Sequence, residues 1–161
     1  IGVRAGLWMP TSARGEKPDA TICVGFALRL PIWPRANLGR VELGFDTSAA
    51  DMDMSTYQNG TYYESASADY SDFTISYLMH FGGPKRATCG YIGFGAGIGA
   101  ESWTRERAGV EEEWENDTAV FVVKLGWDSF RNFYFELSYR ALTDSGRNID
   151  GMFAVVFGLY L

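Results

Sequence analysis

The chain of 161 residues is poor in cysteine, histidine and charge, and it has no excess of positive charge. Its 14 Lys and Arg residues against 20 Asp and Glu residues give a net charge of −6. This balance excludes nucleic-acid binding, because neutralising phosphates requires a basic surplus. Cys23, Cys89 and the single His80 lack the spacing of the common structural zinc sites. No run of about 18 apolar residues is present, so we expect no transmembrane helix, and we expect no metal ion and no cofactor.

The dominant pattern is an alternation of bulky apolar residues with small or charged ones. It accompanies 19 glycines and an aromatic content of 16%. Ile22 and Phe26, for example, lie on one face of a segment whose other face carries the smaller Cys23. This period of two recurs about eight times and is typical of β-strands with one buried face. The chain length fits one domain, so we interpret residues 1–161 as a single all-β domain.

Eight antiparallel strands joined in sequence predict an up-and-down barrel, and the interior volume decides which face points inward. The interior of an eight-stranded barrel is just wide enough to be filled by side chains, so the many large apolar residues cannot all fit inside. They must point outward, and an outward belt of Phe, Leu, Ile and Val requires lipid as its solvent. The predicted fold is therefore an eight-stranded antiparallel up-and-down transmembrane β-barrel.

The lengths of the connectors support a bacterial outer-membrane location. Long or polar connectors are predicted at residues 10–20, 47–71, 102–116 and 143–150, and short ones at residues 31–39, 82–87 and 129–132. Outer-membrane barrels alternate longer external loops with short periplasmic turns. We therefore expect both termini to be periplasmic, with strands of roughly nine to thirteen residues crossing the bilayer.

Three segments resemble a known family. They are the glycine-alternating residues 90–99, the segment Phe135-Glu-Leu-Ser-Tyr-Arg140 and the terminal Phe157-Gly-Leu-Tyr-Leu161. They are similar to strands of the eight-stranded outer-membrane barrels related to the outer-membrane protein A transmembrane domain and to opacity-type surface proteins. The resemblance implies a closed barrel in the outer membrane. We expect no peptidoglycan-binding domain to follow, and we expect the barrel to act alone or as one subunit of a larger envelope assembly.

Several charged residues fall on the inward face, where an isolated charge is costly unless it is paired. We expect them to form a polar network that seals the barrel; the alternative is a gated path for an ion or solute. The predicted network consists of Arg4, Arg29, Arg40, Glu42, Lys124, Glu136 and Arg140.

Four inward glycines alternate with larger residues in residues 93–99. A nucleotide loop would need a strand followed by a tight turn and a helix, which this pattern does not indicate. The glycines instead make space for large inward neighbours and let the strand bend. The expected neighbours are Trp8, Tyr91, Tyr134 and Tyr160.

His80 is the one residue that suggests catalysis. With Ser76 or Ser138 and Glu136 it nominally supplies a Ser-His-acid set. Since His80 falls on the lumen face near the periplasmic end, we expect it to form hydrogen bonds there and predict no catalytic residue. A membrane-embedded enzyme acting on lipid is the alternative. Cys23 and Cys89 fall near opposite ends of the barrel, which is too far apart for a disulfide, so we expect two free thiols.

The predicted external loops combine aromatic and acidic residues. Rigid amphipathic rings are typical of contact surfaces, so these residues indicate docking of a protein or surface ligand. The alternative is a solvated acidic face that binds divalent ions bridging lipopolysaccharide phosphates, although no spacing matches a defined calcium loop. The candidate residues are Tyr57, Tyr62, Tyr63, Tyr70, Trp103, Glu111, Glu112, Glu113 and Trp114.

The function predicted from the sequence is that of a small closed barrel without enzymatic activity. It would stabilise the envelope and present its acidic and aromatic loops to a partner. The expected partners are outer-membrane lipid, lipopolysaccharide, and a protein bound through the loops or the membrane-facing side. A soluble ligand-binding calyx is a further alternative, and it would require the bulky face to point inward.

Overall fold

The computed structural model describes residues 1–11, 19–32, 39–48, 52–58, 61–81, 88–107, 110–129, 132–143 and 151–161. Every regular element within these ranges is a β-strand. No helix in the described ranges is long and apolar enough to cross a membrane.

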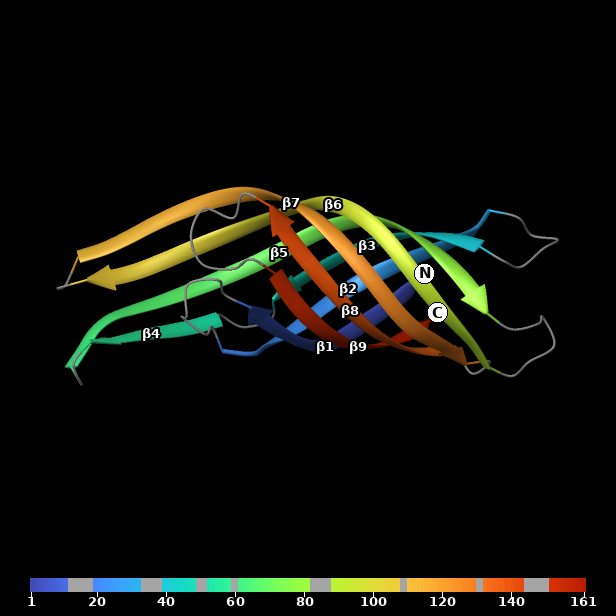
Figure 1. Ribbon diagram of the computed structural model, residues 1–161, viewed down its shortest axis with the longest axis horizontal. Coiled ribbons are helices and arrows are strands. Elements are labelled where there is room, and N and C mark those ends of the chain that lie inside the picture. Colours follow the sequence, from blue (N-terminus) through green and yellow to red (C-terminus); the bar gives the residue numbers. More distant parts are fainter. Residues whose placement is uncertain are drawn as a thin grey trace.

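The strands form one antiparallel sheet that closes on itself (Figure 1). They are β1 (Gly2–Thr11), β2 (Thr21–Pro31), β3 (Gly39–Ser48), β4 (Met52–Gln58), β5 (Thr61–Phe81), β6 (Thr88–Arg107), β7 (Val110–Ser129), β8 (Phe133–Thr143) and β9 (Gly151–Tyr160). β1 pairs with β9, and β3 pairs with β5, so β4 lies outside the ring. The barrel therefore has eight strands, as the sequence predicts.

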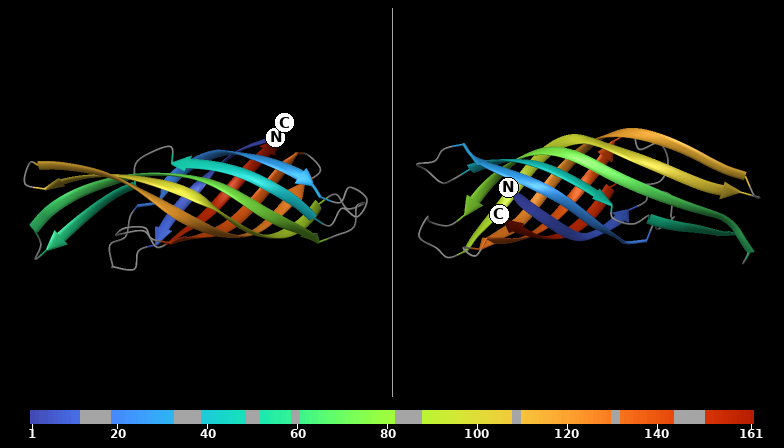
Figure 2. Two further views of the ribbon diagram at one scale, coloured as in Figure 1. Left: turned by 90° about the horizontal axis from the view of Figure 1, so that it is seen from above. Right: turned by 180° about the vertical axis from the view of Figure 1, so that it is seen from behind.

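The two ends of the barrel differ. At one end, which we call the terminus end, the backbone amide of Leu161 donates to the carbonyl of Ile1 at 2.9 Å, and the two termini lie side by side (Figure 2). There the amide of Tyr160 donates to the carbonyl of Asn132 at 2.7 Å. Asn132 has φ of 64°, a left-handed conformation in which asparagine is enriched. The opposite end is the ribbon end, named for the sheet that projects from it.

The alternation places the side chains as predicted. Phe26 is 59% exposed, Ile98 70% and Trp127 57%, all on the outer face, whereas Trp8 and Lys124 on the inner face are 0% exposed. An apolar belt thus surrounds a barrel with a polar and aromatic interior. A soluble calyx would have the opposite arrangement, so the exposures favour lipid as the outer solvent.

Two of the predicted connectors are wrong. Residues 47–71 and 102–116 are largely strand rather than loop, because β5, β6 and β7 continue past the belt for a total of 21, 20 and 20 residues. With β4 they form a four-stranded sheet, the ribbon, that projects beyond the other strands (Figure 1). Outside a membrane both faces of a strand can be polar, so backbone pairing continues where the alternation of hydropathy has ended. The other predicted connectors, at residues 10–20, 31–39, 82–87, 129–132 and 143–150, lie mostly outside the described residues.

The position of the belt can be tested on β7. Its outward residues run from Ala119 to Trp127 within the barrel, and Val123 is the middle one. Val123→Arg is expected to lower the free energy of unfolding by about 2–4 kcal/mol, because an arginine at the bilayer midplane loses its hydration. Glu115→Arg, on the same face but in the ribbon, is expected to change it by about 0.5 kcal/mol or less. Urea titration of protein folded into phosphatidylcholine vesicles measures both values, and equal losses would contradict the assignment of the belt.

Candidate functional site

The lumen contains a continuous chain of ion pairs, which starts near the ribbon end. Arg140 donates to Asp72 at 2.8 Å and to Asp46 at 2.5 Å. Asp46 also accepts two hydrogen bonds from Arg4, at 2.5 and 2.6 Å. All four side chains are almost completely buried. The two arginines and the two aspartates therefore neutralise each other away from water.

Glu42 is the centre of this chain. Its carboxylate accepts from Arg4 at 3.1 Å, from Arg29 at 2.5 Å and from Lys124 at 2.6 Å. Lys124 also lies 3.4 Å from the second buried glutamate, Glu136. Glu42, Lys124 and Glu136 are all 0% exposed. Three cations around one carboxylate recover part of the hydration that each group loses on burial.

Arg29 links the centre to the terminus end. It donates to Asp128 at 2.7 Å and also to the hydroxyl of Tyr160. Its guanidinium carbon lies 4.3 Å from the ring centre of Tyr134 and 4.7 Å from that of Tyr91, which adds cation–π attraction. Five donors in a planar fork allow one arginine to satisfy carboxylates and hydroxyls from several strands at once.

Asp128 closes the chain at the terminus end. It also accepts from Arg40 at 3.3 Å and lies 3.0 Å from Nε2 of His80. The Arg40 side chain is 34% exposed, so this is the one cation of the network that reaches the mouth of the barrel. His80 is 4% exposed and points into the lumen, as predicted.

All seven residues of the predicted network take part in it, but three further members of the network were not predicted from the sequence. Five of the seven predicted residues are cations and two are carboxylates, so the predicted set carries uncompensated positive charge. Asp46, Asp72 and Asp128 supply the missing charges. The network then has five cations and five carboxylates. Asp46 and Asp128 already lay on the inward face of the alternation, and the need for neutrality was the signal that could have identified all three.

The nominal Ser-His-acid set is not brought together by the hydrogen bonds of the structure. His80 pairs with Asp128 rather than Glu136. The hydroxyl of Ser138 accepts from Arg140 at 3.0 Å, and Glu136 accepts from the Tyr91 hydroxyl at 2.8 Å. These side chains are thus committed to the interior network.

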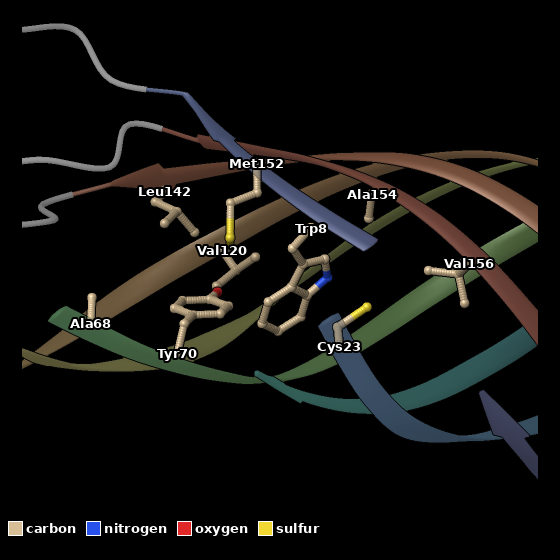
Figure 3. Packing of buried hydrophobic residues seen from close by; sticks show 9 residues of the cluster. All are labelled: Trp8, Cys23, Ala68, Tyr70, Val120, Leu142, Met152, Ala154 and Val156. Atoms are coloured by element: carbon tan, nitrogen blue, oxygen red, sulfur yellow. The ribbon is translucent and has the colours of Figure 1, made fainter. Parts of the chain in front are cut away.

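The ribbon-end half of the lumen is filled by an apolar cluster. Figure 3 shows it converging on Trp8 and Tyr70, whose ring centres lie 5.2 Å apart in an edge-to-face arrangement. Met152 and Leu142 pack in the same cluster. Trp8 also lies 5.4 Å from the guanidinium of Arg140, where the apolar cluster meets the ionic network. The lumen is therefore filled in two layers, one apolar and one ionic.

Tyr70 was predicted to be part of an external contact surface, and this is wrong. It is 1% exposed and belongs to the apolar cluster. Asp72 and Thr74 of β5 are buried on the inward face, and Tyr70 continues this inward row two residues toward the N-terminus, into the segment predicted to be a loop. Tyr70 therefore fills the lumen.

Glycines make room for the rings, but not in the predicted pairs. A Cβ on Gly126 would lie within 2.6 Å of the Tyr91 ring, and one on Gly158 within 2.6 Å of the Tyr134 ring. In the predicted lane, Gly99 makes room for Tyr70 and Gly93 for Leu78. The Tyr91 and Tyr134 rings are thus accommodated by glycines of β7 and β9 rather than by those of β6.

The outward face of the ribbon carries a row of acids. On β7, Glu111, Glu113, Glu115 and Asp117 are all exposed, and we call them the carboxylate ladder. No ion pair to them exists among the described side chains. The ladder confirms the exposure of Glu111 and Glu113. The side chains of the other predicted contact residues, Tyr57, Tyr62, Tyr63, Trp103, Glu112 and Trp114, lie outside the described residues.

Cys23 and Cys89 are both free thiols, as predicted. Cys23 is buried in the apolar cluster and Cys89 is half-buried in β6 near the terminus end. Among the described residues, no group of three or more His, Cys, Asp and Glu side chains is arranged to hold a metal ion.

Comparison with known proteins gives matches in structure alone. No protein-family model and no curated protein matches the chain. Ail, the attachment invasion locus protein of Yersinia pestis, superposes with a TM-score of 0.63 at 15% identity, covering 98% of this chain and 95% of that one. Ail has also been solved in complex with the heparin analogue sucrose octasulfate.

Two further barrels are similar. The outer-membrane enzyme PagL superposes with a TM-score of 0.61 at 12% identity, covering all of both chains. The N-terminal β-barrel domain of Pseudomonas aeruginosa OprF gives a TM-score of 0.54 at 12% identity, covering 98% of this chain and 96% of that one. At these identities the likeness concerns the fold. This chain therefore has the fold of the eight-stranded outer-membrane β-barrels.

The neutrality of the lumen can be tested at Glu42. Glu42→Gln leaves three cations around a neutral amide and is expected to lower the free energy of unfolding by about 3–5 kcal/mol. The control Arg40→Gln removes a partly exposed cation at the mouth and is expected to cost about 1 kcal/mol or less. Adding Lys124→Gln to Glu42→Gln restores neutrality, so the double variant is expected to lose less than the sum of the two single losses. Urea titration measures the unchanged protein and the four variants, among them Lys124→Gln alone. A loss for Glu42→Gln no larger than that for Arg40→Gln would refute the ionic account of the lumen.

Proposed function

We propose that this protein is a closed, non-enzymatic barrel of the bacterial outer membrane that stabilises the envelope and presents its ribbon to a partner outside the cell. The observation that carries the proposal is the contrast between a filled lumen and a four-stranded ribbon projecting beyond the belt. In this arrangement the interior serves stability, and the ribbon carries the exposed polar surface available for contact.

The filling of the lumen argues against a permanent channel. Trp8, Tyr70 and Met152 occupy the ribbon-end half and are at most 1% exposed. Toward the terminus end, Arg140 and Glu42 are each held by several hydrogen bonds. An ion would have to displace both layers to pass, because eight strands leave room for side chains and little else.

The position of His80 argues against catalysis on membrane lipid. The imidazole faces the lumen, is 4% exposed, and is occupied by Asp128. A lipid in the bilayer contacts the outer face, on which Phe73 and Phe121 are exposed. The fold itself is compatible with either function, because barrels with enzymatic activity and barrels without it share it.

The ribbon end is the external end in this proposal, and both termini are periplasmic. At the ribbon end β5, β6 and β7 extend well past the belt, with total lengths of 21, 20 and 20 residues. Outer-membrane barrels place such extensions outside the cell and their short turns in the periplasm. Outer-membrane lipid then surrounds the belt, and lipopolysaccharide surrounds the base of the ribbon.

A planar-bilayer recording tests whether the barrel is closed. The purified protein is expected to insert without steady current, because both layers of the lumen block the passage of ions. Insertion is verified on the same sample by protease protection of the belt. Steady conductance in defined steps would contradict the closed barrel and favour the gated path.

In vivo photo-crosslinking tests the presentation of the ribbon. A photoreactive phenylalanine analogue at Tyr62, Tyr63 or Trp114 is expected to give discrete protein adducts, because aromatic side chains are frequent anchors of protein contacts. The same analogue at the belt residues Phe73 and Phe121 is the matched control and is expected to label lipid. Identical labelling from ribbon and belt positions would contradict a contact role for the ribbon.

A further inference from the structure

The carboxylate ladder has a regular geometry. Glu111, Glu113, Glu115 and Asp117 occupy every second position of β7, so their side chains leave the same face of the ribbon. Successive members lie about 7 Å apart along the strand. The ladder continues the outward face of Ala119 and the belt, and it begins where the belt ends. Four carboxylates therefore stand in one line on the part of β7 that is farthest from the barrel.

The positions of β6 directly across from the ladder do not compensate these charges. In the pairing of β6 with β7, Asp117 lies opposite Ala100, Glu115 opposite Ser102, and Glu113 opposite Thr104. Glu111 lies opposite another acid, Glu106. The residues across from the ladder thus include no cation, and like charges at this spacing repel each other.

The other side of this stretch of β7 is a strand edge that has no partner strand among the described residues. β7 pairs with β8 only from Ala119 to Asp128, because β8 ends at Thr143. Within the described residues, β7 from Val110 to Thr118 pairs only with β6. Half of the backbone amide and carbonyl groups in this stretch therefore face outward at an unpaired edge, which is a template for a further strand.

The open edge and the ladder coincide on the same nine residues, 110–118, and together they specify a ligand. We propose that this edge binds an extended, cationic segment of a partner protein, with Lys or Arg at every second position. The segment adds to the ribbon as a fifth strand through backbone hydrogen bonds. Its cationic side chains then lie on the face of the ladder, directly across from the carboxylates at about 5 Å between Cβ atoms. This proposal rests on the proposed function, because it names the chemistry of the partner that the ribbon presents itself to.

Charge also excludes the other classes of occupant. A second copy of this edge would bring four carboxylates against four carboxylates. A polyanion of the kind that Ail holds in its complex with sucrose octasulfate would meet the same repulsion here. A cationic strand is the occupant that both the backbone and the side chains of the edge can satisfy.

A synthetic peptide tests the proposal on the whole chain folded in phosphatidylcholine vesicles. The probe is a fluorescent octapeptide of alternating Lys and Thr, and the control peptide has the same composition with the lysines in one block. Fluorescence anisotropy at low salt is expected to show binding of the alternating peptide and at least about tenfold weaker binding of the block peptide, because only alternation puts every Lys across from the ladder. Equal affinities would overturn the proposal.

Two matched variants locate the site. Glu111→Gln, Glu113→Gln, Glu115→Gln and Asp117→Asn together neutralise the ladder and are expected to weaken peptide binding about tenfold or more, since each exposed ion pair contributes modestly. Asp51→Asn, Asp53→Asn, Glu64→Gln and Asp69→Asn remove the same charge from residues 51–69 of the chain instead, and these changes are expected to weaken peptide binding about threefold or less. Equal weakening by both variants would mean attraction by net charge and would overturn the site.

Backbone methylation of the peptide tests strand addition itself. In one peptide the nitrogens of all lysines are methylated, and in another those of all threonines. A strand exposes these two sets of N–H groups on opposite edges, so one methylated peptide is expected to bind normally and the other to lose binding. Equal binding of both would overturn strand addition.

Bridging of the ladder to lipopolysaccharide by divalent ions predicts a different result. Ladder-dependent binding of lipopolysaccharide vesicles that requires Mg²⁺, without peptide binding, would overturn the cationic strand in favour of bridging by divalent ions. Ribbon crosslinks in cells without peptide binding would overturn this partner chemistry and leave the presentation of the ribbon intact. The absence of both ribbon crosslinks in cells and peptide binding would overturn the proposed function as well.

Discussion

Lys124, Glu42 and Glu136 are completely buried in a barrel whose interior is as wide as its side chains and no wider. Each of these charges would cost several kcal/mol if it were buried alone. Their mutual neutralisation is one part of the condition under which the small and charged face of every strand can point inward. The other part is the neutralisation of Arg4, Arg29 and Arg140 by the buried carboxylates, which include Asp46, Asp72 and Asp128. The outward direction of the bulky face, and with it the lipid belt, follows from the same condition.

The filled lumen also determines where function can reside. The apolar layer around Trp8 fills the ribbon-end half of the lumen, and the ionic layer fills the other half with the protein's own side chains. Contact with other molecules is then left to the belt, which meets lipid, and to the ribbon, which leaves the membrane. The same strands serve both environments, because the outer face of β5, β6 and β7 changes from apolar to polar without a break in backbone pairing.

The strands within the membrane could be predicted from the sequence, because one face of each meets lipid and the other meets the lumen. Within the membrane, one face of each strand must be apolar, so a residue such as Phe121 or Lys124 reveals its side by its chemistry alone. Past the membrane both faces are polar, and β4 and the outer halves of β6 and β7 show no contrast in hydropathy. The dipeptide Asn59-Gly60, which favours two-residue hairpins, was a local signal for β4 within the segment interpreted as a loop.

The functional residues divide in the same way. The seven predicted lumen charges follow from alternation, but their aspartate partners depend on which strands meet across the barrel, and a single strand does not show this. Arg140 and Asp46, for example, come from β8 and β3, which are not neighbours in the sheet. The open edge of β7 depends on where β8 ends relative to its neighbour, which is a property of the register. The alternation of residues therefore predicts on which face of its strand a side chain lies. Which side chains then pair with each other depends on how the strands are arranged in the closed sheet.

The central claim, that the bulky face meets lipid and the charged face fills the lumen, is tested most directly by membrane fractionation combined with electrophoresis before and after boiling. A closed barrel of this kind stays folded in detergent at room temperature. The account predicts a band in the outer-membrane fraction whose mobility changes on boiling. A monomer that is soluble without detergent, with the same mobility before and after boiling, would show that the two faces are assigned the wrong way round.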